Sequence, residues 1–133
     1  MSGGRLTEEA LRQFTGGLDR YRHGLNRSVL YTEGVRYVAD TAGAYWLIDA
    51  IASHIGSAEF KRAARADNRI SLMHFWKLAV EPDRSAVLTA VADSGEPAFI
   101  EQAIEFTDFP LSELSVWAAN DTEHWHVYLP SEH

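Results

Sequence analysis

The sequence predicts an α+β fold in which N-terminal helices pack on a twisted antiparallel sheet built as a meander. Between Ala44 and Ile55, apolar residues recur at spacings of three and four, which is typical of one face of a helix. From Ile70 onward, apolar and polar residues alternate with a period of two, which is typical of antiparallel strands. A chain of 133 residues has room for one core, so we expect residues 1–133 to form a single domain.

The predicted helices begin at capping residues and end at glycines. Thr7 is expected to cap a first helix that Gly16 and Gly17 end. The central helix is expected to start at Asp40 or Thr41, to run to about His54 and to end at Gly56. A further short helix is expected from residue 57 to about residue 66.

The segments between these helices contain candidate turns. Val29–Tyr31 and Val35–Val38 are β-branched and aromatic runs on either side of Gly34, a pattern that favours a small hairpin. Residues 18–27 follow neither period and are expected to form a loop. After Ile70 we expect strands at residues 70–80, 86–92, 98–106, 114–118 and 125–129, separated by turn residues.

Composition limits the classes of function. The chain carries 12 Lys and Arg against 19 Asp and Glu, a formal net charge of -7, so nucleic-acid binding by the whole surface is not expected. It has no cysteine, which excludes disulfides and thiolate metal sites and is compatible with a reducing cytosol. Because the most apolar run, residues 42–52, is interrupted by Asp49 and is too short to span a bilayer, we expect a cytoplasmic protein that does not enter a membrane.

One locally basic stretch, residues 20–27, is a candidate binding segment. Arginines that alternate with aromatic rings can stack on bases and pair with phosphates, which would suit a nucleotide ligand. The same arginines could instead neutralise nearby carboxylates of the protein itself. No glycine-rich phosphate loop accompanies the segment. The candidate residues are Arg20, Tyr21, Arg22, His23 and Arg27.

Other polar residues suggest weaker sites. Asp49, Ser53 and His54 could suggest the acid, nucleophile and base of a small hydrolase, but residues one or two apart on a helix do not face each other, so this helix alone cannot form a triad. Asp49 is better explained as the acceptor of a hydrogen bond from a neighbouring strand or loop, for example from Tyr31, Tyr37 or an arginine, that fixes the central helix against the hairpin. His124 and His126 point to one face of a predicted strand, but two imidazoles without a third ligand do not define a metal site. We therefore predict neither a cofactor nor a metal ion.

The aromatic content suggests an interaction surface. The four tryptophans, five tyrosines and six phenylalanines exceed what a small core needs, and exposed aromatic rings often anchor protein interfaces. Trp46, Trp117 and Trp125 are the candidates, and one of the three is expected to lie at a surface.

Several strings of residues along the chain support a comparison with a known family. The most distinctive are Ala44–Ser53 (AYWLIDAIAS) and Glu105–Leu111 (EFTDFPL), and the others are Phe14–Gly16, Tyr21–His23, Leu30–Tyr37, Trp76–Leu78 and Leu129–Glu132. In order and wording they resemble a family of small proteins of unknown function carried by phages, plasmids and bacterial chromosomes. The likeness begins near Gln13 and is lowest over residues 56–69.

The resemblance implies a biological setting and no functional residues. Small accessory proteins of mobile elements often inhibit host defence, for example restriction or CRISPR complexes, or sequester signalling nucleotides. The leading hypothesis is therefore a non-enzymatic counter-defence inhibitor that docks on a host protein complex. The alternatives are a nucleotide-binding protein and a hydrolase that uses Asp49 and His54. A sheet with open edges could also pair into a homodimer.

Overall fold

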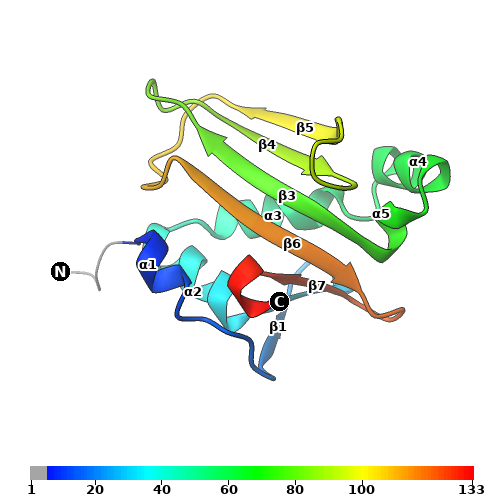
Figure 1. Cartoon of the computed structure of the whole chain (residues 1–133), viewed down its shortest axis with the longest axis horizontal. Coiled ribbons are helices and arrows are strands. Elements are labelled where there is room, and N and C mark those ends of the chain that lie inside the picture. Colours follow the sequence, from blue (N-terminus) through cyan, green and yellow to red (C-terminus); the bar gives the residue numbers. More distant parts are fainter. Residues whose placement is uncertain (1–5) are drawn as a thin grey trace.

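A computed structural model describes residues 6–133 as a seven-stranded sheet with helices packed on one face (Figure 1). The strands are β1 (Arg20–Arg22), β2 (Val29–Thr32), β3 (Met73–Val80), β4 (Ala86–Val91), β5 (Ala98–Ile104), β6 (Glu113–Asn120) and β7 (Trp125–Tyr128). The helices are α1 (Glu8–Leu11), α2 (Glu33–Ala42), α3 (Tyr45–His54), α4 (Ala58–Ala66) and α5 (Arg69–Leu72), and a 3-10 turn spans Pro130–Glu132. The predicted α+β class is confirmed. Within residues 6–133, no helix has the length and apolar composition that a membrane span requires.

The strand order is β1-β2-β7-β6-β3-β4-β5, and every pair is antiparallel except β2 and β7, which run parallel. Strands β3, β4 and β5 form the predicted meander, but β6 crosses back to the free side of β3, so the prediction of a single meander is wrong. Strand β6 buries Leu114, Val116 and Ala118. An apolar strand at the edge of a sheet would expose unpaired backbone groups to other chains, so a position in the middle of the sheet is favoured.

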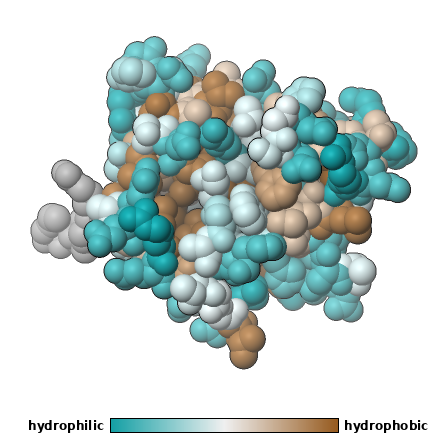
Figure 2. All heavy atoms as spheres, viewed as in Figure 1, coloured by the Kyte–Doolittle hydropathy of each residue, from teal (hydrophilic) through white to brown (hydrophobic). Residues whose placement is uncertain are grey.

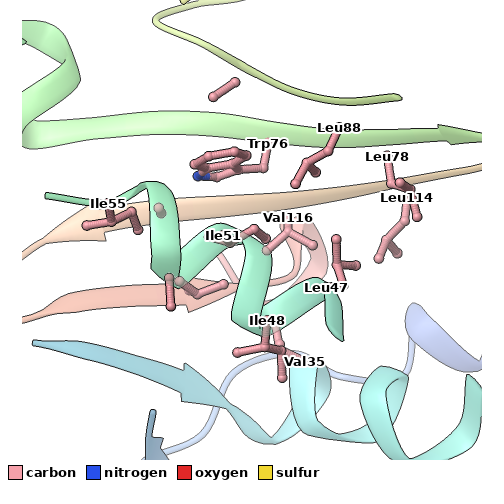
Figure 3. Packing of buried hydrophobic residues seen from close by; sticks show 14 of the residues in the cluster. Val35, Leu47, Ile48, Ile51, Ile55, Trp76, Leu78, Leu88, Leu114 and Val116 are labelled. Atoms are coloured by element: carbon pink, nitrogen blue, oxygen red, sulfur yellow. The ribbon is translucent and has the colours of Figure 1, made fainter. Parts of the chain in front are cut away.

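The core lies between α3 and the middle strands. Leu47 and Ile51 of α3 point toward Leu114 and Val116 of β6, and Trp76 of β3 lies above the same helix (Figure 3). These side chains are at most 5% exposed. Apolar burial of this kind is the main stabilising term of the fold, and the predicted packing of the central helix on the sheet is confirmed.

The predicted hairpin around Gly34 is wrong, because residues 33–42 form α2. The backbone N–H of Val35 donates to Oγ1 of Thr32, which caps the helix start. Val35, Val38 and Ala39 are buried at helical spacing, so this pattern fits a helix face better than a strand face. Strand β2 pairs instead with β1, which lies inside the segment expected to be a loop.

Several helix limits differ from the predictions for local reasons. Gly43, at φ +62°, ends α2, so the central helix begins at Tyr45 and not at Asp40 or Thr41. Helix α1 is capped by Thr7 as predicted but ends at Leu11, ahead of the two glycines. The cap of α4 is Ser57, and β3 begins at Met73 because residues 69–72 form α5.

The C-terminal turn binds the start of α2. The Glu132 carboxylate accepts hydrogen bonds from Oγ1 of Thr32 (2.6 Å) and from the backbone N–H groups of Gly34 (3.2 Å) and Leu129 (2.9 Å). Ser131 donates to the carbonyl of Leu11 at 3.0 Å. The last residues of the chain therefore tie α1, β2 and α2 together, and we call this arrangement the C-terminal latch.

Candidate functional site

The two faces of the sheet differ in what covers them. Helix α3 lies behind β3 and β6 in Figure 1, and the C-terminal turn lies toward the viewer, beside β7. A groove of about 600 Å³ lies on the face turned to the viewer. In Figure 2, apolar and weakly polar side chains gather over the strands, with hydrophilic ones around them. We call this feature the open groove; its lining includes Phe75, Lys77, Thr89, Val91, Asp93, Ser94, Gly95, Ser115 and Trp117.

Two aromatic rings form the centre of the open groove. Phe75 and Trp117 are directly paired across β3 and β6, and their rings meet edge to face with centroids 5.3 Å apart. Both side chains are half-buried. The Trp117 ring also lies 5.2 Å from the ring of His133, so the C-terminal turn borders the groove. Such a rigid pair presents apolar area that loses little conformational entropy on binding.

Two charged residues, Lys77 and Asp93, line the groove, and we call these two and the residues joined to them by ion pairs the rim. Lys77 lies 3.6 Å from Glu113, and Arg69 lies near the carboxylates of Asp67 (2.7 Å), Glu96 (2.9 Å) and Asp93 (3.8 Å). Hydrogen bonds from Arg69 hold the pKa of Asp67 below its ordinary value. The rim therefore carries more carboxylates than cations, and its negative charge matches that of the whole chain.

The basic segment at residues 20–27 does not form one surface. Strand alternation sends Arg20 and Arg22 to the open face and Tyr21 to the helical face. Nε of Arg20 donates to Nδ1 of His126 at 3.2 Å, and its Nη1 donates to the carbonyls of Gly17 and Asp19. Arg22 and Arg27 are exposed. In the described ion pairs, none of these arginines neutralises Glu33, Asp40 or Asp49; the partner of Asp40 is Arg36.

His23 and Asp49 come together as a pair. Nε2 of His23 lies 2.7 Å from Oδ1 of Asp49, and the backbone N–H groups of Leu25 and Asn26 donate to Nδ1 of the same ring. Because Nδ1 is an acceptor, this network places the proton on Nε2, which donates to Asp49. Asp49 thus accepts a hydrogen bond from a neighbouring loop, as expected, but the donor is His23 and not a tyrosine or an arginine.

A group of tyrosines surrounds this pair on the helical side. The rings of Tyr21 and Tyr31 lie 5.7 Å apart, and the guanidinium of Arg36 sits 4.5 Å above the Tyr21 ring. Tyr45 donates to Oδ1 of Asp40 at 2.6 Å. Burial raises the pKa of Tyr31, Arg36 opposes this, and the carboxylates of Asp40 and Asp49 add to the rise, so the phenol stays neutral at pH 7.

The residues considered for catalysis and metal binding are engaged elsewhere. Nε2 of His54 lies 2.7 Å from Oε1 of Gln102, whereas Asp49 pairs with His23, so the two hydrolase candidates do not meet. His126 pairs with Asp121 at 2.7 Å, an interaction that lowers the pKa of Asp121. Across the described part of the chain, no group of three His, Asp or Glu residues is placed to hold a metal ion.

The three candidate tryptophans have different environments. Trp125 is 8% exposed and packs against Phe60 and His74, so the expectation that its ring could be an exposed anchor is wrong. Trp46 is half-buried and packs against the core. Trp117 lines the open groove and is the one that a partner can reach on the sheet face.

Sequence reasoning missed most of the groove. Phe75, Lys77, Thr89 and Val91 line it beside Trp117. The available signal was the alternation of side chains along β3. Phe75 points to the opposite face from His74 and Trp76, so both faces of this strand carry aromatic side chains. An antiparallel sheet commonly leaves one face to solvent, so the second aromatic set indicated a surface feature.

Comparisons with known proteins give a family and no function. The model of the family of unknown function DUF6876 matches residues 5–133. No curated protein matches the chain. No solved structure matches it either. Because the family model covers almost the whole sequence, including every strand and helix described above, the chain belongs to the DUF6876 family.

Proposed function

We propose that this protein is a non-enzymatic binding protein that docks on a protein partner through the open groove. The observation that carries the proposal is the Phe75–Trp117 pair, which lies edge to face in a groove of about 600 Å³ on the sheet face that the helices leave free. Tryptophan is among the residues that dominate binding energy at protein interfaces, where a polar rim typically surrounds the aromatic centre.

The charges at the rim specify the surface of the partner. Asp67, Asp93, Glu96 and Glu113 face Arg69 and Lys77, and the chain as a whole carries a net charge of -7. Electrostatic complementarity therefore favours a partner with an apolar centre and basic surroundings. Protein complexes that bind nucleic acids present such basic surfaces.

The proposed setting is counter-defence, with a restriction or CRISPR complex of the host as the target. Its support is the resemblance to proteins of phages and plasmids, together with the fit between an acidic aromatic groove and a basic nucleic-acid-binding surface. Inhibition by occupancy needs no catalytic group, and among residues 6–133 the groove lining brings together no nucleophile–base pair.

The test measures protection of phage and plasmid DNA in cells that carry defined restriction and CRISPR systems. Wild-type protein is expected to raise the efficiency of plating against at least one system, and the variants Trp117→Ser and Phe75→Ser to abolish this effect. Phe106→Ser is the matched control, because Phe106 is 69% exposed and lies outside the groove. Stable 1:1 association with the purified effector should weaken as salt rises.

Two results would contradict the proposal. One is an absence of protection against every system tested, together with no complex formed with any purified effector. The other is protection that survives both groove substitutions while the proteins remain folded. The second result would place recognition on another surface and leave counter-defence standing.

The two alternative functions have less structural support. A nucleotide site formed by residues 20–27 would need cations in one cavity, and the pocket beside His23 is lined by Asp49 and by no arginine or lysine. A hydrolase would need Asp49 and His54 in contact, and each is bonded to a different residue. Both stay untested predictions.

A further inference from the structure

A second, smaller pocket lies on the helical side of the sheet, away from the open groove. It has a volume of about 190 Å³ and is formed where the loop after β1 meets β2 and α3. Its walls are the rings of Tyr31 and Tyr45 and the side chain of Ile48, and its polar groups come from His23 and Asp49. This volume suits a small head group and not a whole nucleotide.

The pocket is lined by one carboxylate and by no lysine or arginine. Asp49 is 70% exposed, and its one ion-pair partner in the described chain is His23. That histidine is 9% exposed, and its Nδ1 accepts two backbone N–H groups, which leaves Nε2 as the atom that donates to Asp49. One carboxylate oxygen is engaged by His23, and the other has no hydrogen bond among residues 6–133.

The neighbouring residues show how this protein accommodates an organic cation. The guanidinium of Arg36 lies 4.5 Å above the Tyr21 ring and its Nε lies 3.6 Å from Oδ2 of Asp40, so an aromatic face and a carboxylate share one cation. The adjacent pocket offers the same two elements, since Tyr45 bridges the sites through its bond to Asp40. Neither lysine nor arginine lines it.

We propose that this pocket binds an organic cation, an ammonium or guanidinium group, between the rings of Tyr31 and Tyr45 and the carboxylate of Asp49. Cations are attracted to the faces of aromatic rings, and aromatic cages recognise quaternary ammonium groups in this way. Phosphate-bearing ligands are disfavoured, because they would approach the Asp49 carboxylate without a compensating cation. The ligand is either a free amine or a lysine or arginine side chain of another protein.

The test uses two cationic probes and one neutral probe, followed by amide chemical shifts and calorimetry. Choline represents a free amine, capped arginine amide represents a protein side chain, and 3,3-dimethylbutan-1-ol is the uncharged isostere of choline. At least one cation should shift the amides of residues 23–25, 31 and 45–49 and bind at least about tenfold more tightly than the alcohol. A preference for choline identifies a free amine as the ligand, and a preference for the capped arginine identifies a side chain.

Substitutions separate charge from packing. Asp49→Asn keeps an oxygen acceptor for His23 while removing the charge, and it should weaken cation binding at least about tenfold. Asp108→Asn is the matched control, because Asp108 is exposed and lies outside the pocket, and its effect should stay within about twofold. Tyr45→Leu should weaken binding as well, which provides a second variant if Asp49→Asn does not fold.

Three outcomes would overturn the proposal: equal binding of the alcohol and the cations, unchanged affinity in folded Asp49→Asn, or no shift of the pocket amides at about 10 mM probe. The pocket and the open groove lie on opposite faces of the sheet. A negative result with the cationic probes therefore leaves the protection experiment, which tests the open groove, unaffected.

Discussion

Gly34 is the residue at which the C-terminal latch leaves least room. A Cβ atom at this position would lie 2.7–2.9 Å from the Glu132 carboxylate, which three hydrogen bonds hold in place. Gly34→Ala should therefore destabilise the protein by about 1 kcal/mol, although alanine normally favours a helix over glycine by about that amount. Denaturant unfolding measures the difference. Gly17→Ala, which meets nothing within 4 Å, is the control.

A double substitution tests the cause of this effect. Once Glu132→Ala has removed the carboxylate, Gly34→Ala should become neutral or stabilising, because only its helix preference remains. An equal loss of stability in both backgrounds would show that the latch is not the reason for the glycine.

His74 makes stability depend on pH. Its ring is fully buried among Phe60, Trp76, Phe99 and Trp125, and burial lowers its pKa from 6.5 to about 4. Between these values the unfolded chain binds the proton and the folded chain does not, so stability falls as pH drops from 6.5 toward 4. The loss should be on the order of 3 kcal/mol.

Unfolding free energies measured between pH 4 and 7 check this prediction. His74→Phe should flatten the curve in this window, whatever its effect on stability at pH 7. His124→Gln alters a histidine outside the core and should leave the slope as in the wild type. A slope that persists in His74→Phe would assign the acid sensitivity to other groups.

Among the elements, α3 depends on a side chain from the loop between β1 and β2. Nδ2 of Asn26 donates to the carbonyls of Ala52 (2.9 Å) and Ile55 (3.1 Å) at the end of the helix. Asn26→Asp would place a carboxylate against both carbonyls with almost no change in shape. We expect a loss of about 2–4 kcal/mol at neutral pH, partly recovered in acid, when the carboxyl is protonated.

Thermal unfolding at two pH values measures this effect. Asn68→Asp is the matched substitution, since Asn68 is exposed and makes no side-chain cap, and it should change stability by less than about 0.5 kcal/mol. Equal effects of the two substitutions would show that the Asn26 side chain does not stabilise α3.

The elements also show what the sequence can and cannot predict. Strands β3 to β7 were predictable because one face of each contacts the core, which gives a local period of two. Helix α2 was not predictable, because Val29–Thr32 and Val35–Val38 contain similar residue types. The contact that distinguishes the two runs is distant in sequence, since Thr32 is held by Glu132, 100 positions away. The open groove escaped prediction for the same reason, since the pairing of Phe75 with Trp117 follows from the crossover that places β6 beside β3.

At the scale of the whole molecule, the C-terminal latch joins parts that lie far apart in the sequence. Removing residues 130–133 would delete the hydrogen bonds to Leu11, Thr32 and Gly34 and the His133 ring stacked on Tyr128. We expect a loss of about 2–5 kcal/mol, since each hydrogen bond contributes about 1 kcal/mol and bound groups are left unpaired.

Hydrogen exchange can locate this loss. The amides of α1 and of the first turn of α2 should exchange faster in the truncated protein. The amides of β3 and β4, which lie outside the hydrogen bonds of the latch, should change only in proportion to global stability. Uniform acceleration throughout would show that the latch stabilises the fold only as a whole.

The parallel pairing of β2 with β7 bears on how the chain is made. Strands β1 and β2 join the rest of the sheet only through β7, and β7 ends five residues before the C-terminus. Synthesis reaches β7 only after β3 to β6, so the N-terminal pair has to wait without its neighbour until those strands have been made. Until then the nascent chain exposes an unpaired β2 edge that chaperones or aggregation can act on.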